Sequence, residues 1–212
     1  MLGRLLYAGV VVALLGSGIA PHDRFTWWLE VSWVLAGLVL IAVLWRRGVQ
    51  LTTSLKIAMF VHALILIYGG LHTYERVPLG EWMKMAFGYT RNHYDRIGHF
   101  VQGLFPAVLA REVLFRQRVV PSPRWRELFV FSLCMAFTGL FEILEYLTAI
   151  AFGEASAAFL GSQGDIWDAQ NDMILCGIGT LVSILLWGAL HRRQLLQLVR
   201  QGPASKSQEQ AL

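Results

Sequence analysis

Carboxylates and histidines recur at helical spacing in three apolar stretches of the sequence. Asp95 and His99 are four residues apart, which places both side chains on one face of a helix. Glu142 and Glu145, three residues apart, share a face in the same way. A third stripe, spaced by three and then four residues, consists of Asp165, Asp168 and Asp172. Because a charged side chain beside lipid is costly and usually functional, we predict one pocket that contains Asp95, His99, Glu142, Glu145, Asp168 and Asp172.

Several carboxylates around an imidazole can hold a divalent metal ion. Facing helices of a bundle build such sites; oxygen ligands favour Mg²⁺, Ca²⁺ or Mn²⁺, and histidine adds Zn²⁺ or Fe²⁺. The expected metal ligands are Asp95, His99, Glu142, Asp168 and Asp172. In an enzyme the metal would activate water, with Glu142 or Glu145 as the general base and His99 as the acid or a ligand. The residues expected to support the site are His72, Glu75, His93, Arg96, Asp165 and Asn171.

The charge balance of this region also indicates a bound cation. The carboxylates expected there are Asp95, Glu142, Glu145, Asp165, Asp168 and Asp172. The nearby fixed cations, Arg76, Arg91 and Arg96, are too few to neutralise them. Either protons or a metal ion must supply the remaining positive charge. Structural explanations stay open for single members, since Asp165 can cap a helix N-terminus and Asp95 can form a surface ion pair.

The composition predicts a membrane protein. The chain has 212 residues, of which 56% are hydrophobic and only 15% charged, and its mean hydropathy is +0.52. An ordinary soluble domain is less apolar. The basic residues fall between apolar stretches and not on one continuous face, so no nucleic-acid partner is expected. Cys134 and Cys176 lie inside apolar stretches and are interpreted as small core residues.

Six apolar stretches are candidates for membrane-spanning helices of about 20 residues. They lie near residues 5–20, 27–45, 57–71, 97–115, 128–152 and 173–190. We therefore predict an all-α, polytopic six-helix transmembrane bundle that forms a single domain over residues 1–200. The first stretch is short, and a cleaved signal peptide is the alternative interpretation of it. Residues 201–212 are expected to form a disordered cytoplasmic tail.

The distribution of charge predicts the orientation of the bundle. Basic residues gather in the loops after the second and fourth stretches and in the C-terminal tail, whereas most acids lie at the opposite side. By the positive-inside rule, both termini are cytoplasmic in a bacterial inner membrane, and the acidic pocket faces outward. Residues 77–89 combine Trp82, Met85 and Phe87 with Lys84. This pattern is typical of an amphipathic helix on the outer membrane surface, and a packed loop that caps the bundle is the alternative.

The same residues carry a resemblance to bacterial membrane families. Residues 95–100 are similar to the D-[KR]-x-x-H-F opening of the VanZ-like family, and residues 141–145 and 165–179 to its acidic and D-x-x-D-x-x-x-N-x-x-G motifs. Glu145 and Asp172 stand where that family has Gln and Asn, and they add negative charge. From Pro21 onward, the sequence is more fully similar to the inner-membrane proteins typified by YjdF. This resemblance implies a six-span inner-membrane protein and no particular reaction.

Three functions are compatible with these patterns. The first is a metal-dependent hydrolase or transferase that acts on a lipid or lipid-linked substrate of the outer leaflet; Gly177 and Gly179 would let helices approach closely around its site. The second is an ion-coupled transporter, because buried carboxylates and histidines also relay protons and cations. The third is a structural or accessory membrane protein in which the polar cluster only holds the helices together. The sequence does not determine the oligomeric state.

Overall fold

The computed structural model describes residues 1–200, and this part of the chain is helical with short connections. The predicted tail, residues 201–212, lies outside the described residues. The longer helices are α1 (Leu2–Ser17), α2 (Arg24–Arg46), α3 (Thr53–His72), α4 (Pro78–Phe87), α5 (Tyr94–Leu104), α6 (Pro106–Arg116), α7 (Pro123–Phe152), α9 (Asp168–Val182) and α10 (Gly188–Arg200). The short elements are η1 (Tyr74–Arg76), η2 (Gly153–Ser156), α8 (Ala157–Leu160) and η3 (Ser183–Trp187).

The starts of several helices follow from local sequence. The Asp23 carboxylate accepts a hydrogen bond of 2.7 Å from the Thr26 amide and so caps α2. Thr52 caps α3 in the same way by accepting from the Leu55 amide at 3.2 Å. Proline occupies the first turn of α4, α6 and α7, where its missing N–H has no intrahelical partner to lose.

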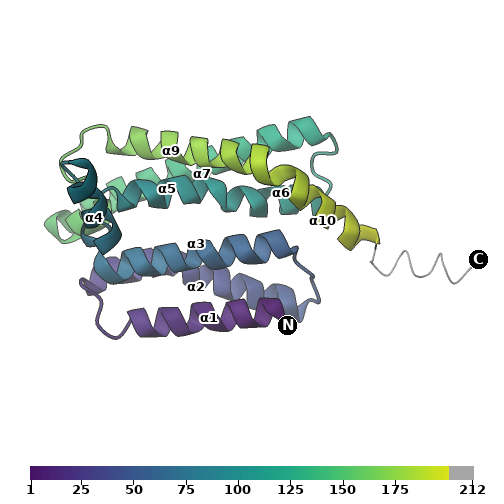
Figure 1. The fold of residues 1–212 in the computed structure, drawn as a ribbon, viewed down its shortest axis with the longest axis horizontal. Helices are drawn as coiled ribbons and strands as arrows, with labels where there is room; N and C mark the ends of the chain where they lie inside the picture. The colour runs from purple at the N-terminus through teal and green to yellow at the C-terminus, as the bar shows by residue number, and fades with distance from the viewer. Residues whose placement is uncertain (201–212) are drawn as a thin grey trace, which may run out of the picture.

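The helices form two layers that run along the same axis (Figure 1). One layer contains α1, α2 and α3, and the other contains α5, α6, α7 and α9. The first layer is packed through a core that includes Val31 and Val34, and the second through Ala107, Val130 and Cys176. The helix α4 lies across one end of both layers. The start of α1 and the end of α10 lie together at the other end, as expected for an even number of passes.

The fourth predicted stretch, residues 97–115, is not one straight helix. A single helix was predicted over residues 97–115, but α5 ends at Leu104 and α6 begins at Pro106. The reason is Pro106, which has no amide to continue the hydrogen-bond ladder and whose ring excludes the carbonyl of the preceding turn. The chain bends at Phe105 and continues along the bundle, so the break separates two helices of 11 residues each.

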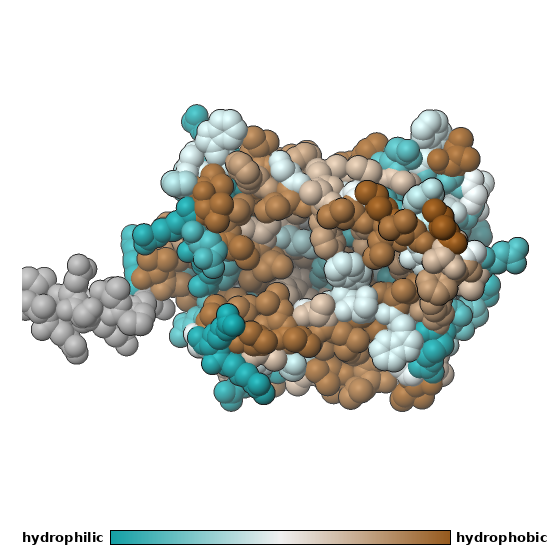
Figure 2. Space-filling model, turned by 180° about the vertical axis from the view of Figure 1, so that it is seen from behind, coloured by the Kyte–Doolittle hydropathy of each residue, from teal (hydrophilic) through white to brown (hydrophobic). Residues whose placement is uncertain are grey.

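The dimensions of the helices fit a lipid bilayer. Four helical segments of the described chain are long and apolar enough to cross a membrane: Arg24–Arg46, Thr53–His72, Pro123–Leu160 and Asp168–Arg200. The helix Leu2–Ser17 is apolar but shorter. Hydrophobic side chains cover the middle of the molecular surface, and hydrophilic ones gather toward its two ends (Figure 2). The fold is thus the expected all-α membrane bundle, in which four passes are clear by length and composition.

Two glycines bring α5 and α9 into backbone contact. A Cβ atom on Gly103 of α5 would lie 1.9 Å from the Cys176 carbonyl oxygen, and one on Gly179 of α9 would lie 1.9 Å from the Phe100 carbonyl oxygen. Any larger residue at either position would push the helices apart. The expected role of Gly179 is therefore seen, whereas Gly177 faces the Met135 and Phe131 side chains of α7.

The end of the bundle that carries α4 is closed by two connecting segments. Asn92, between α4 and α5, donates to the Val77 carbonyl at 3.0 Å and to Glu81 at 3.1 Å. Its backbone exchanges two hydrogen bonds of 2.9 Å with the side-chain amide of Gln163, in the loop that precedes α9. The helix α4 covers residues 78–87 of the stretch 77–89, and its position on a membrane surface stays a prediction.

A candidate metal centre at one end of the bundle

Three of the predicted side chains meet inside the bundle near the end that α4 covers. Asp95 and His99 project from α5, and Asp172 projects from α9. Each offers one potential ligand atom, and these three atoms lie within 4.8 Å of one another. All three residues are buried, with His99 at 5% and Asp172 at 2% exposure. The glycine contact between α5 and α9 is what brings these two helix faces together.

The His99 imidazole lies between two carboxylates without bonding to either. Its Nε2 is 3.7 Å from Asp95 Oδ1, and its Nδ1 is 3.6 Å from Glu142 Oε1 on α7. Both separations exceed a hydrogen bond. His99 Nδ1, Glu142 Oε1 and Asp172 Oδ1 are buried and have no hydrogen-bond partner. Unsatisfied buried polar atoms are rare and indicate an ion, a water or a substrate at the site.

The spacing of His99 Nε2 and Asp95 Oδ1 suits two ligands of one ion, whereas the three atoms of the triad lie within 4.8 Å of one another. Nitrogen and oxygen ligands at about 2.1 Å from a common metal lie roughly 3 to 4 Å from each other. The separation of 3.7 Å between His99 and Asp95 falls in this range. A nitrogen and several oxygens form a donor set that suits Zn²⁺ or Mn²⁺ and is less typical of Ca²⁺.

A layer of ion pairs covers the cluster on its outer side. Arg91 Nη1 lies 2.5 Å from Asp168 Oδ1 and 3.5 Å from Asp165 Oδ2. Arg96 forms an ion pair with Asp165 as well and lies 3.9 Å from Asp168. Two arginines therefore balance two aspartates. Asp168, which was predicted to be a metal ligand, is instead positioned as a partner of Arg91.

Asp165 organises the loop that leads into α9. Its Oδ1 accepts from the Trp167 amide at 2.9 Å, and its Oδ2 accepts from Asn171 Nδ2 at 3.2 Å. The amide of Trp167, assisted by the Arg96 guanidinium, holds the pKa of Asp165 below its usual range. Asp165 is thus not the N-cap of α9, which is Trp167, but it fixes the turn immediately before the helix.

Gly161 lets the same loop close over Asp95. Its φ is +63°, and a Cβ atom at this position would lie 3.3 Å from Asp95 Oδ2. Its carbonyl accepts a hydrogen bond of 3.0 Å from Arg91 Nη2. A side chain here would meet both backbone strain and the carboxylate. The loop, the arginines and α5 thus enclose one side of the cluster.

The inner side of the cluster opens into a small cavity of about 60 Å³. Asp95, His99 and Gln102 line it from α5, and Glu30 lines it from α2. Glu30 is buried, and Tyr74 lies within hydrogen-bonding reach of it. A cavity of this size and polarity has room for water next to the cluster.

Glu142 and Glu145 add two more carboxyl groups from α7. Glu145 lies within hydrogen-bonding reach of Glu142, as their helical spacing predicts. The inner group of acids thus comprises Glu30, Asp95, Glu142, Glu145 and Asp172. Among the described residues, its cationic neighbours are Arg91, 3.8 Å from Asp95 and already paired with Asp168, and Arg96, which is paired with Asp165. The carboxyl groups are therefore concentrated in the region where the unsatisfied atoms lie.

Three predicted supporting residues lie apart from the cluster. The His93 ring packs against Tyr89 with ring centres 4.6 Å apart. Partial burial, together with Arg96 and Arg91, lowers the pKa of His93, so a neutral ring is favoured. His72 packs against Tyr68, and Glu75 pairs with Arg76 at 3.4 Å. These contacts are structural, and none of these residues belongs to the group that can hold an ion.

Sequence reasoning missed Glu30 and Tyr74. Glu30 is the only acid within its apolar stretch, and that isolation was the available signal. It has no helical partner of like chemistry, because its neighbours in the site come from α5 and α7. Tyr74 gave no signal, since its position depends on the short turn η1 that follows α3.

A second polar cluster lies at the opposite end and is separate from the first. Glu112 accepts from Thr52 Oγ1 at 2.6 Å and from Arg116 Nε at 2.9 Å, and lies 3.1 Å from His191 Nε2. Arg111 forms a bidentate pair with Glu127 at 2.8 to 3.0 Å. Since both oxygens of Glu112 have partners, this cluster is a structural connection between α3, α6 and α10.

A bundle of apolar helices with a buried acidic and histidine cluster defines a polytopic integral membrane protein. The chain belongs to the family described as "Predicted membrane protein (DUF2238)", which it matches over residues 2–193. It is also 39% identical to the inner membrane protein YjdF of Escherichia coli strain K12 over 189 residues, which cover 88% of each chain. No solved structure matches it. The resemblance to the YjdF group is thus confirmed, and that to the VanZ-like family stays a similarity of motifs.

Proposed function

We propose that this protein is a metal-dependent hydrolase or transferase that acts within the membrane on a lipid or lipid-linked envelope substrate. The observation that carries the proposal is the convergence of Asp95, His99 and Asp172, whose ligand atoms lie within 4.8 Å of one another in a buried site. Asp172 Oδ1 supplies further support, because this buried carboxylate oxygen has no hydrogen-bond partner among the described residues.

The surrounding groups provide what metal-assisted hydrolysis requires. A divalent cation bound by these three residues would lower the pKa of a coordinated water toward neutrality. Glu142 lies 3.6 Å from His99 and is placed to accept a proton from that water or to act as a fourth ligand. The cavity beside Glu30 provides space for the water, and the layer of arginine and aspartate pairs shields the site.

The class of substrate follows from the location of the site. The cluster lies inside an apolar bundle near one end, which the charge distribution predicts to be the outer one. The adjoining helix α4 exposes Leu79, Trp82, Met85 and Phe87, side chains that favour the lipid interface. A substrate that resides in the bilayer can approach such a site without crossing water.

Elemental analysis of the full chain, purified in an uncharged detergent, tests the metal. We expect about one Zn²⁺ or Mn²⁺ ion per chain in the wild type, as for sites with a few protein ligands. Asp172→Asn should lose the ion and stay folded, whereas Glu154→Gln, an exposed loop acid, should retain it. Metal-free wild type that neither takes up added ions nor changes its thermal stability with them would support the structural alternative.

The reaction is tested separately on lipids. Envelope lipid extracts incubated with the metal-loaded wild type should show products that are absent with Asp172→Asn, as measured by mass spectrometry. A protein that binds the metal tightly but converts no lipid would leave the site intact and contradict the enzymatic function. That outcome would favour the ion-coupled transporter, because a buried cation site also serves transport.

A further inference from the structure

Three cavities follow one another along α3. The small cavity beside the candidate metal centre shares Trp33, His62 and Leu66 with an apolar cavity of about 130 Å³. The apolar cavity in turn shares Trp45 and Lys56 with an open pocket of about 500 Å³ at the end of the bundle where α1 begins. Together the three cavities lie between the helices α1, α2 and α3 and the bend at Phe105.

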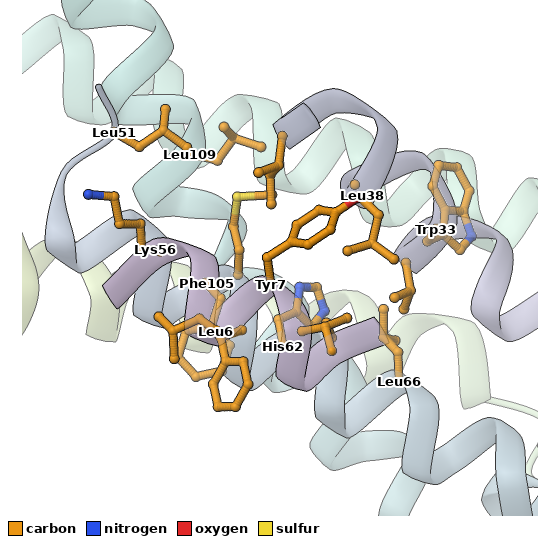
Figure 3. Close-up of a pocket in the computed structure, with 18 of the residues that line it drawn as sticks. Leu6, Tyr7, Trp33, Leu38, Leu51, Lys56, His62, Leu66, Phe105 and Leu109 are labelled. Atoms are coloured by element: carbon orange, nitrogen blue, oxygen red, sulfur yellow. The ribbon is translucent and has the colours of Figure 1, made fainter. Parts of the chain in front are cut away.

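The middle cavity is lined almost entirely by apolar side chains. Figure 3 shows Leu6, Tyr7 and Leu38 beside it, Lys56 toward one end, and Trp33 toward the other. A dry apolar cavity of about 150 Å³ holds a molecule as large as benzene, so this one of about 130 Å³ accepts a short length of hydrocarbon chain. It is therefore suited to an acyl segment and not to a polar solute.

The open pocket at the end has the opposite chemistry. Arg4 and Lys56 line it, together with the first turn of α3 at Thr53. Within the described chain, no Asp or Glu lines this pocket, and neither Arg4 nor Lys56 forms an ion pair. The first amides of α3 already have side-chain acceptors, so the positive charge of the pocket comes from Arg4 and Lys56. The pocket is thus suited to a phosphate group.

Lys56 joins the two environments. It lines both the apolar cavity and the open pocket. Its aliphatic stem packs close to Gly3, with Cδ 3.6 Å from the position of a Cβ there, alongside the Trp45 ring. A lysine in this arrangement extends an apolar stem through hydrocarbon and places its ammonium group at the polar boundary. An occupant with a hydrocarbon chain and a phosphate would match both parts.

We propose that the protein binds one anionic glycerophospholipid here, with its phosphate at Arg4 and Lys56 and a segment of one acyl chain in the apolar cavity. This site is independent of the metal centre and of the proposed reaction. Basic pockets between transmembrane helices recognise anionic headgroups, and each basic side chain near the lipid phosphate strengthens binding about fivefold. A zwitterionic lipid fits less well, since its own cation would lie among these basic groups.

The test uses native mass spectrometry of the full chain in an uncharged detergent. Dioleoyl phosphatidylglycerol and dioleoyl phosphatidylcholine are compared, with glycerol 3-phosphate as the soluble headgroup. We expect the wild type to retain one phosphatidylglycerol in preference to phosphatidylcholine, and Lys56→Gln to weaken that preference about fivefold. The matched control is Arg47→Gln, an exposed residue that lines neither cavity. Equal retention of both lipids, or an undiminished preference in Lys56→Gln, would overturn the proposal.

A second pair of variants tests the buried chain. Gly37→Leu places a side chain in the apolar cavity, where the nearest side-chain atom to a new Cβ is Met59 Cε at 4.0 Å. Gly16→Leu on α1 is the control, because its Cβ would meet open space away from this cavity. Gly37→Leu should reduce phosphatidylglycerol retention several-fold, whereas Gly16→Leu should not. Unchanged retention in Gly37→Leu, or displacement of the lipid by glycerol 3-phosphate, would contradict a buried acyl chain.

Discussion

The carbonyl oxygen of Phe100 on α5 lies 1.9 Å from the point where Gly179 of α9 would carry a Cβ atom. The two helix backbones are therefore in direct contact one residue beyond His99. Asp172 lies two helical turns before Gly179 on the same helix, so the closeness of these helices determines the distance between Asp172 and His99. A backbone packing contact thus sets the geometry of the candidate metal centre.

Substituting Gly179 should separate the two helices. Gly179→Ala forces its Cβ against backbone that cannot rotate away, and overpacking of this kind destabilises by about 2 kcal/mol or more. We expect a lower unfolding temperature in detergent and weaker metal retention, because Asp172 moves away from His99. Gly139→Ala is the matched control, since its Cβ would meet only Met173 Cε at 3.8 Å. It should be neutral or stabilising by up to about 1 kcal/mol. Equal behaviour of the two variants would contradict the role of this contact.

The membrane helices could be predicted from the sequence because they depend on local properties. A stretch of about 20 apolar residues must be helical in lipid to satisfy its backbone hydrogen bonds. The helical spacing of Asp95 with His99 likewise required no knowledge of the fold. Pro106 also indicated a break in the helix, but the apolar stretch continues through that residue, and a single helix was predicted.

The sequence did not reveal that the acids form two groups, an outer group paired with arginines and an inner group around His99. Asp168 and Asp172 are one helical turn apart on one stripe of the sequence, yet the first pairs with Arg91 and the second joins the ligand cluster. The depth at which α9 crosses α5 decides this, and that depth depends on the tertiary contact of Gly103 and Gly179. Glu30 was missed because its position also depends on tertiary structure: it reaches the site from α2, in the layer of α1, α2 and α3.

The outer and inner groups of acids predict different effects of substituting Asp168 and Asp95. Asp168→Asn removes one partner of the buried Arg91, so stability should fall while the metal is retained. Asp95→Asn should lose the metal, because it removes a charged ligand from the cluster. Thermal unfolding and elemental analysis of both variants provide the measurement. Loss of the metal in Asp168→Asn with no loss of stability would place Asp168 among the ligands instead.

The hydrogen bond that Asp165 accepts from the Trp167 amide and its ion pair with Arg96 predict a pH dependence. The pKa of Asp165 is lowered in the folded protein, so its stabilising effect is complete above its unfolded pKa, near 4. The effect is lost as the pH falls through the lower, folded pKa. The difference in unfolding temperature between the wild type and Asp165→Asn should therefore be present at pH 6 and decrease below about pH 4. Glu154→Gln, which changes an exposed acid, should show no such difference; a constant difference for Asp165→Asn would contradict the lowered pKa of Asp165.

The cluster around Glu112 should matter for stability alone. Glu112→Ala leaves Arg116 and Thr52 without their shared acceptor in a site where the glutamate is 1% exposed. Removing one partner from a buried pair costs about 3 kcal/mol or more. Metal content per folded chain should stay unchanged, since this cluster lies at the other end of the bundle. Arg124→Gln, an exposed change on the same face, is the control. A metal-free but stable Glu112→Ala protein would show an unexpected connection between the two ends.

Glu142 separates catalysis from metal binding. Its Oε1 lies 3.6 Å from His99 Nδ1 and has no hydrogen-bond partner, so it is placed to receive a proton from a water at the metal. Glu142→Gln keeps the shape of the side chain but cannot act as a base. We expect it to retain the metal and to lower the rate of lipid conversion about 10²- to 10⁴-fold, the usual contribution of a general base. Glu145→Gln, one turn away on the same helix, should have a smaller effect on the rate, because that residue reaches the cluster through Glu142. If Glu142→Gln instead loses the metal, Glu142 is a fourth ligand, and the base must be sought at Glu145 or at Glu30 across the cavity.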